Sequence, residues 1–196
     1  LMLMIPGPTP VPEAALLALA KHPIGHRTSE FSNILAEVTA NLKWLHQTES
    51  DVLMLTASGT GAVEAGIINF LSPGDRVLVG CNGKFGDRWG EVAEAYGLQV
   101  DKITAEWGKP LDPAVFAEKL AADKEKQIKA VILTHSETST GVLNDLEAIV
   151  GHVKEHGEAL MILDAVTSLG AYNVPMDTLG IDVIASGSQK GYMIPP

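Results

Sequence analysis

Short, almost wholly apolar segments alternate with helical patterns along this chain of 196 residues. An apolar strand implies a sheet covered on both faces, and strands separated by helices imply parallel crossovers. We therefore expect a three-layer α/β/α domain with a mostly parallel sheet. The predicted strands are 52–55, 76–79, 98–103, 130–134, 159–163 and 182–185, and the predicted helices are 62–70, 87–96, 113–122 and about 144–156.

Composition narrows the class of protein. A net charge of −10 argues against a nucleic-acid partner, because such proteins gather Lys and Arg. No apolar run approaches the roughly 20 residues of a membrane span, so no membrane partner is expected. The single cysteine, Cys81, suits a reducing compartment, and we expect a cytoplasmic protein. The chain stops at Pro196 directly after its most reactive segment, which predicts the N-terminal part of a longer polypeptide.

Ligands of such sheets sit beyond the carboxyl ends of the strands, so the residues that follow each strand matter most. Ser58-Gly59-Thr60-Gly61 opens a predicted helix, where free N–H groups and the helix dipole suit a phosphate. The alternative is a tight turn in which Ser58 or Thr60 only caps the helix. Phe85, between glycines in a predicted loop, could lie flat on a planar ring, although an isolated Phe is more often a core residue.

The later strand ends carry polar groups. Residues 135–141 are rich in hydroxyls. Asp164 ends a buried strand, where a carboxylate needs a partner; it could face a protonated ring nitrogen, or cap a following helix. No metal is expected, because no neighbouring side chains give a metal-ligand spacing. Lys190 follows the last strand among small residues, a placement that suits imine formation with an aldehyde. Most lysines are simply solvated, so this interpretation depends on the whole set lying at one sheet edge.

These residues resemble the class V aminotransferases, a family of fold-type-I enzymes that use pyridoxal 5'-phosphate (PLP). The likeness is greatest to the alanine–glyoxylate and serine–glyoxylate aminotransferases. Similar sequences are also labelled as a cyanobacterial "soluble hydrogenase" small subunit, although a hydrogenase metal centre needs cysteine ligands that this chain lacks. The motifs that carry the resemblance are Asp164 to Gly170, Gly180-Ile181-Asp182, Ser186 to Lys190, Pro6 to Thr9, Gly25-His26-Arg27, Ser58 to Gly61, Asn82 to Gly86 and Thr138 to Gly141.

The resemblance implies a role for each matching residue. Lys190 would hold PLP as a Schiff base and move the substrate proton, and Asp164 would pair with the pyridine nitrogen. The other cofactor contacts would come from Ser58, Gly59, Thr60 and Gln189 at the phosphate, Phe85 and Val166 on the two ring faces, and Thr138 at the ring hydroxyl. Relatives often carry Trp where Phe85 stands. Residues 1–20, with Pro6 and Gly7 near the substrate, would close over a PLP-binding large domain at 21–196, and a small C-terminal domain would be missing from this chain.

The implied reaction is transamination of alanine or serine with glyoxylate, by a homodimer with shared active sites. The partners would be small amino acids and keto acids. One alternative is a cysteine desulfurase or related lyase of the same class, which usually carries a stacked His and a mobile Cys. Another is a non-catalytic relative with the same layered sheet. A dinucleotide-binding protein is disfavoured, because Ser58-Gly59-Thr60-Gly61-Ala62-Val63 lacks the third glycine of that motif.

Overall fold

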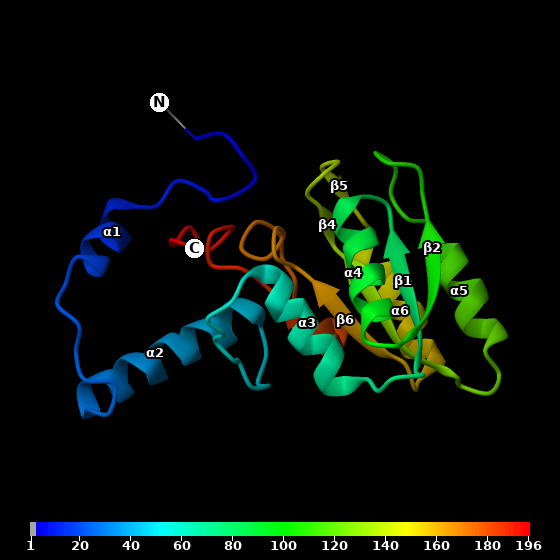
Figure 1. Cartoon of the computed structure of the whole chain (residues 1–196), viewed down its shortest axis with the longest axis horizontal. Helices are drawn as coiled ribbons and strands as arrows, with labels where there is room; N and C mark the ends of the chain where they lie inside the picture. Colours follow the sequence, from blue (N-terminus) through cyan, green and yellow to red (C-terminus); the bar gives the residue numbers. More distant parts are fainter. Residues whose placement is uncertain (1–2) are drawn as a thin grey trace.

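The central feature of the computed structural model, which describes residues 3–196, is a parallel five-stranded sheet. Its spatial order is β2-β1-β3-β6-β7, of which Figure 1 labels β2, β1 and β6. Because β1 has β2 on one side and β3 on the other, the strand order reverses at β1, as in doubly wound α/β folds. The strands are β1 (Arg76–Cys81), β2 (Gln99–Thr104), β3 (Ile128–Thr134), β6 (Leu160–Asp164) and β7 (Val183–Ala185).

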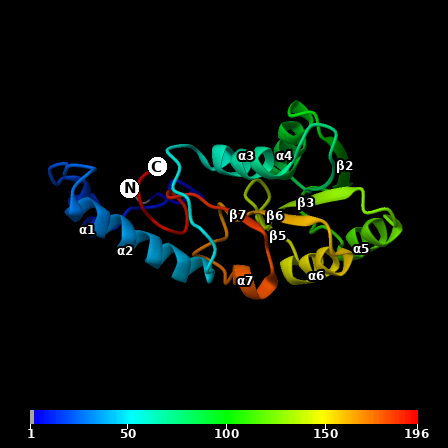
Figure 2. The same ribbon diagram turned by 90° about the horizontal axis from the view of Figure 1, so that it is seen from below.

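Helices cover both faces of this sheet and complete the predicted three layers. In Figure 2, α3 (Gly59–Phe70) and α4 (Lys84–Ala95) lie above the strands. On the opposite face lie α5 (Pro113–Ala122), α6 (Leu146–His156) and α7 (Met176–Leu179). Successive side chains of β3 alternate between the two faces: Ala130 and Ile132 pack under α3 and α4, while Val131 and Leu133 face α5 and α6. The domain therefore has two cores separated by the sheet.

Local sequence signals set the ends of the helices. Ser58 Oγ accepts a hydrogen bond from the N–H of Gly61 and caps α3. Asp112 caps α5, with Pro113 in its first turn. Asp145 caps α6, and this helix ends at Gly157, whose φ of 86° suits glycine at a helix C-terminus.

The predicted strand at 52–55 is wrong. These residues form neither a strand nor a helix, and Leu53 is 80% exposed. An apolar run becomes a strand only when a neighbouring strand supplies hydrogen-bond partners. Within residues 3–196 the sheet ends at β7, and no strand pairs beyond it. The Ser58 turn therefore begins a helix, as predicted, without following a strand.

The structure also contains elements that the sequence patterns did not predict. Helices α1 (Glu13–Leu19) and α2 (Ser29–His46) extend away from the sheet (Figure 1). Among the residues of α2 only His46 is buried, and its Nε2 lies 2.7 Å from the Tyr192 hydroxyl. A short antiparallel pair, β4 (Ser136–Glu137) and β5 (Val142–Leu143), follows β3.

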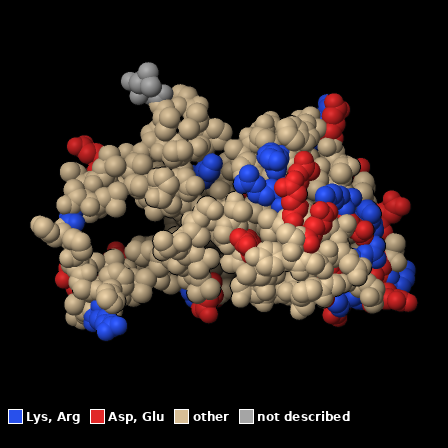
Figure 3. Space-filling model, in the orientation of Figure 1, with Lys and Arg blue, Asp and Glu red and all other residues tan. Residues whose placement is uncertain are grey.

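Two surface properties complete the description. On the face drawn in Figure 3, Lys and Arg intermingle with Asp and Glu over the sheet and its helices, without a large area of one sign. No helix in residues 3–196 is long and apolar enough to cross a membrane. Residues 1 and 2 of the predicted N-terminal segment lie outside the described part of the chain.

Candidate active site

Val166 lies at the centre of the predicted site residues. It follows β6, in the turn that comes after Asp164. A β-carbon on Gly59 would lie 2.9 Å from Val166 Cγ2, so the first residue of α3 packs directly against this side chain. A β-carbon on Gly187 would lie 3.2 Å from Val166 Cγ1 and 3.1 Å from Gln189 Oε1. The start of α3 and the loop after β7 therefore meet at Val166, as the sheet-edge prediction requires.

Asp164 presents a buried carboxylate at the end of β6. It is 4% exposed, and burial raises the pKa of its carboxyl to about 6, with the nearby Glu137 carboxylate adding to the rise. Oδ1 accepts a hydrogen bond from the N–H of Val166 at 2.9 Å. The chain after it forms a turn and no helix, so the alternative role of helix cap does not apply.

Trp89 and Thr134 are site residues that the sequence analysis missed. The indole N–H of Trp89 donates to Asp164 Oδ2 at 2.8 Å and also lies 3.1 Å from Thr134 Oγ1. Trp89 is four residues after Phe85 on α4, a spacing that places both aromatic side chains on one helix face. That spacing was the signal in the sequence from which Trp89 could have been identified. The pairing of Thr134 with Asp164 in the parallel register of β3 and β6 is visible only in the fold.

Phe85 lies in the first turn of α4, which corrects two predictions: the helix starting at 87 and the loop around Phe85. Its side chain is partly buried and packs against the core beneath α3 and α4. Its backbone N–H and that of Gly86 donate to the carboxylate of Glu137, a fully buried residue of β4. The start of α4 is therefore held by an acceptor from β4 in place of a side-chain cap.

Two further predicted residues have polar neighbours. The hydroxyls of Thr138 and Thr167 are 2.6 Å apart, which joins the hydroxyl-rich loop to the turn after β6. Thr60 Oγ1 accepts a hydrogen bond of 3.3 Å from Arg88, whose guanidinium carbon lies 5.4 Å from the centre of the Phe85 ring. Arg88 was not among the predicted residues, and it places a positive charge beside the start of α3.

Lys190 is half-buried and lies under the N-terminal segment. A β-carbon on Gly7 would lie 2.5 Å from Lys190 Nζ. Thr9 holds the two segments together: its N–H donates to the carbonyl of Gln189 at 3.0 Å, and its hydroxyl donates to the carbonyl of Lys190 at 2.9 Å. Pro6 is exposed. Within residues 3–196 the Lys190 amine forms neither an ion pair nor a side-chain hydrogen bond.

Cys81 lies at the end of β1 and is 3% exposed. Burial raises the pKa of its thiol to about 12, with Asp87 contributing. A thiol in this state is a poor nucleophile, because the thiolate is the reactive form. The position therefore does not supply the mobile, reactive cysteine that a desulfurase would use.

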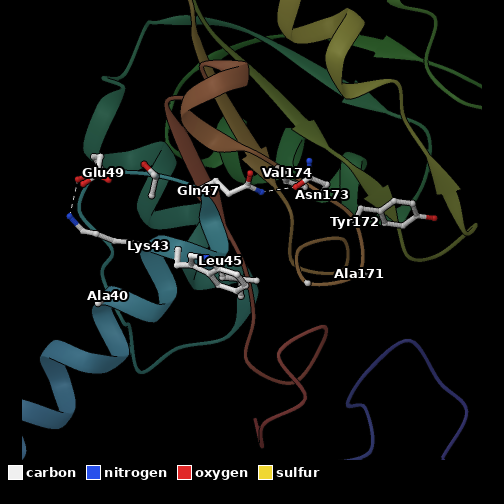
Figure 4. A pocket seen from close by; sticks show the side chains of 12 residues that line it. Ala40, Lys43, Leu45, Gln47, Glu49, Ala171, Tyr172, Asn173 and Val174 are labelled. Carbon is white, nitrogen blue, oxygen red and sulfur yellow. Dashed lines mark hydrogen bonds between the residues drawn. The ribbon is translucent and has the colours of Figure 1, made fainter.

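A cavity of about 940 Å³ lies elsewhere, between the end of α2 and residues 170–174 (Figure 4). Gln47 donates to Asn173 across it, and Lys43 Nζ bonds the carbonyl of Glu49 at its edge. None of its lining residues is a predicted site residue. The chemistry-bearing groups lie instead around Val166 and Lys190, so cavity size does not locate the site in this chain.

Comparison with known proteins places these residues in a family. The family described as "Aminotransferase class-V" matches residues 13–196. The chain is 81% identical to the "Soluble hydrogenase 42 kDa subunit" of Anabaena cylindrica, over 100% of this chain and 51% of that protein. It is 39% identical to the L-aspartate–glyoxylate aminotransferase of Paracoccus denitrificans, over 99% of this chain and 50% of that protein. Proteins named serine–glyoxylate aminotransferase match at 33–37% identity.

Solved structures agree with the sequence comparison. The structure titled alanine–glyoxylate aminotransferase from Nostoc sp. superimposes with a TM-score of 0.92 at 34% identity, covering 100% of this chain and 51% of that one. The chain thus spans about half the length of the curated relatives it matches. Within residues 3–196, no group of three or more His, Cys, Asp or Glu side chains is arranged to hold a metal ion.

Proposed function

Because this chain belongs to the class V aminotransferase family, we propose that its protein transfers amino groups between a small amino acid and glyoxylate, with PLP bound to Lys190. The donor loses its amino group and leaves as a keto acid, while glyoxylate gains that group and leaves as glycine. PLP supplies the electron sink for this chemistry. One observation carries the proposal. Val166, whose N–H donates to Asp164, packs against Gly187 in the loop that leads to Lys190.

The residues around Val166 fit the parts of PLP. Asp164 offers a buried carboxylate to the pyridine nitrogen, whose positive charge offsets the cost of burying that carboxylate. Gly59 lacks the β-carbon that would collide with Val166, so the start of α3 can approach the ring and present backbone N–H groups to the phosphate. Ser58, Thr60 and Gln189 add polar groups there, and Arg88 adds a positive charge.

Four side chains then have assigned tasks in the proposal. Phe85 and Val166 enclose the two ring faces, and Thr138 reaches the ring hydroxyl, supported by Thr167. Lys190 Nζ takes the proton from the substrate α-carbon and returns it later in the cycle. Within residues 3–196 no ion pair holds the Lys190 amine, so that it would be free to move between the cofactor and the substrate proton.

The N-terminal segment would close the site. Gly7 contacts the Lys190 side chain, and Thr9 bonds the backbone on either side of it. Pro6 and Gly7 are therefore placed to cover the substrate and exclude water from the reacting atoms. The proposal keeps alanine or serine as the donor. The relatives are named for aspartate as well as serine, so a direct comparison of the three donors is the test of this choice.

We also propose that the protein is a cytoplasmic homodimer. Exposed apolar side chains support an interface, since a monomer rarely leaves contiguous apolar patches uncovered. They gather on α2, at Ile34, Leu35 and Val38, and in the extended segment at Leu53, Met54 and Leu55. Sedimentation of the native protein tests the dimer, and a monomer at micromolar concentration would contradict it.

The deciding experiment is a visible spectrum of the native full-length protein with PLP, before and after L-alanine, L-serine or L-aspartate. We expect a yellow protein that bleaches with its donor and recovers its colour with glyoxylate. Borohydride reduction followed by peptide mapping should place the cofactor on Lys190. A colourless protein would favour a non-catalytic relative, and a cofactor on another lysine would overturn the proposed site. Release of sulfide from L-cysteine would favour a desulfurase.

A further inference from the structure

Trp89 connects α4 to the carboxylate at the end of β6. Its side chain is 1% exposed, and its indole N–H points at Asp164 Oδ2, 2.8 Å away. Thr134, which is 2% exposed and pairs with Asp164 in the parallel register of β3 and β6, lies 3.1 Å from the same N–H. A buried indole N–H normally finds a hydrogen-bond partner, and here that partner is the carboxylate at the end of β6.

The two oxygens of Asp164 are held from different directions. Oδ1 accepts from the backbone N–H of Val166, and Oδ2 accepts from Trp89. Two donors on separate elements fix the plane of the carboxylate relative to the sheet edge. Hydrogen bonds to a carboxylate favour its charged form, so both donors oppose the effect of burial, which raises the pKa of Asp164.

We propose that Trp89 is a positioning residue for the reaction: its indole N–H holds Asp164 in the orientation and the anionic form that pair with the protonated pyridine nitrogen of PLP. This inference rests on the proposed function. It gives α4 two tasks, because Phe85 lies one helical turn before Trp89 on the same helix. Phe85 would cover a ring face, and Trp89 would act on the ring only through Asp164.

The competing explanation is that Trp89 only fills the core between α4 and the sheet, where it packs with Val79 and Ile132. A core role predicts a loss of stability and nothing else. A positioning role predicts a change at the cofactor in a protein that remains folded. The variant Trp89→Phe separates the two, because Phe keeps an aromatic side chain and removes the N–H.

The first measurement is PLP affinity of the native full-length protein and of Trp89→Phe, by titration of the cofactor-free forms. Loss of a hydrogen bond to a charged group predicts affinity weaker by about 10- to 100-fold. The matched control is Phe116→Leu, since Phe116 belongs to α5 and is fully buried on the opposite face of the sheet. This control should lose stability but keep its PLP affinity.

The second measurement is the pH dependence of PLP affinity. Without the Trp89 N–H, Asp164 should hold its proton to higher pH, so the acid-side loss of affinity should move to higher pH in Trp89→Phe. The neighbouring ionisable groups are Glu137, whose carboxylate contributes to the raised pKa of Asp164, and His135, whose backbone N–H donates to the Asp164 carbonyl. Both are unchanged in the variant, so they do not cause a difference between the two profiles.

The outcomes separate this inference from the proposed function. If wild type binds PLP at Lys190 while Trp89→Phe matches it in affinity and pH profile, Trp89 is only a core residue. If wild type binds no PLP, the proposed function itself fails. Should Trp89→Phe not fold, the indole N–H resonance of Trp89 in wild type provides the test. It should shift when PLP is added, and an unmoved resonance would overturn the inference.

Discussion

Gly7 packs directly against Lys190, since a β-carbon at Gly7 would lie 2.5 Å from the lysine amine. The colliding atoms belong to the flexible end of Lys190, so Gly7→Ala should displace that side chain and leave the fold intact. Moving a side chain off its rotamer costs about 0.5–1.5 kcal/mol. We expect amino-group transfer to slow by roughly two- to tenfold, with the free energy of unfolding within about 0.5 kcal/mol of wild type.

Gly151→Ala is the matched control for this prediction. Gly151 lies inside α6, and a β-carbon there would meet no atom within 4 Å. Alanine should stabilise the helix by about 0.5–1 kcal/mol and leave transfer unchanged. Equal transfer rates in Gly7→Ala and Gly151→Ala would show that the N-terminal segment does not constrain Lys190.

Asp164 should make the free energy of unfolding of the cofactor-free protein depend measurably on pH. Its pKa is raised to about 6 by burial, above the ordinary value of about 3.9. The folded protein therefore binds this proton more tightly than the unfolded chain. The resulting stability is fully present below about pH 4 and is lost as the pH rises through 6. Relative to wild type, Asp164→Asn should gain on the order of 2 kcal/mol in free energy of unfolding between pH 4 and pH 7.

Urea titrations of both cofactor-free proteins at several pH values measure this difference. The amide has a single oxygen, so it also loses a hydrogen bond to Val166 or Trp89, but that loss does not vary with pH. A difference that stays constant from pH 4 to pH 7 would show that the pKa of Asp164 is not raised. Asp164→Asn should also bind PLP more weakly at every pH.

Glu137→Gln should destabilise the start of α4. The buried carboxylate accepts N–H bonds from Phe85, Gly86 and Ser139, and an amide keeps only one accepting oxygen. A buried N–H left without a partner costs about 1–3 kcal/mol, which should appear as a lower free energy of unfolding. Glu118→Gln, at an exposed position of α5, is the control and should change stability by less than about 0.5 kcal/mol. Similar values for the two variants would mean that Glu137 does not hold this helix end.

Gly59 and Val166 should be energetically coupled. A β-carbon on Gly59 would lie 2.9 Å from Val166 Cγ2, so Gly59→Ala should push the start of α3 away and weaken PLP binding. Val166→Ala removes the colliding methyl groups. In the double variant, the loss of affinity should be smaller than the sum of the two single losses, by about 0.5 kcal/mol or more. Additive losses would argue against a direct contact.

Much of the fold could be predicted from the sequence, because an apolar run indicates a buried strand and a capping residue marks the start of a helix. Asp112-Pro113 marked the start of α5 correctly, and the run before Asp164 marked β6. The segment 52–55 failed because apolarity does not supply a pairing strand. Helix α2 was missed although its sequence carries an apolar stripe at helical spacing, which includes Ile34, Leu35 and Val38. In the structure that stripe is exposed, and His46 is the one residue of the helix that is buried.

Site residues at or just after the end of a strand could be predicted from the sequence. Contacts that depend on how helices pack on the sheet could not. Asp164 is the last residue of β6, Thr138 directly follows β4, and Lys190 lies after β7. The contact between Trp89 and Asp164 joins residues 75 positions apart. This contact depends on how α4 packs on the sheet, and no local pattern in a single sequence predicts that packing. The roles of these residues in cofactor binding remain predictions.

The bonds from Thr9 to the backbone of Gln189 and Lys190 have a consequence for biosynthesis. They join residues about 180 positions apart in the chain. A ribosome adding about 5–20 residues per second needs roughly 10–40 s to make that stretch. During that interval the segment around Gly7 has no Lys190 to contact, although the first strands are already available to pair. The N-terminal segment therefore cannot close over Lys190 until that residue has been made, and the proposed capture of PLP has to wait for this contact.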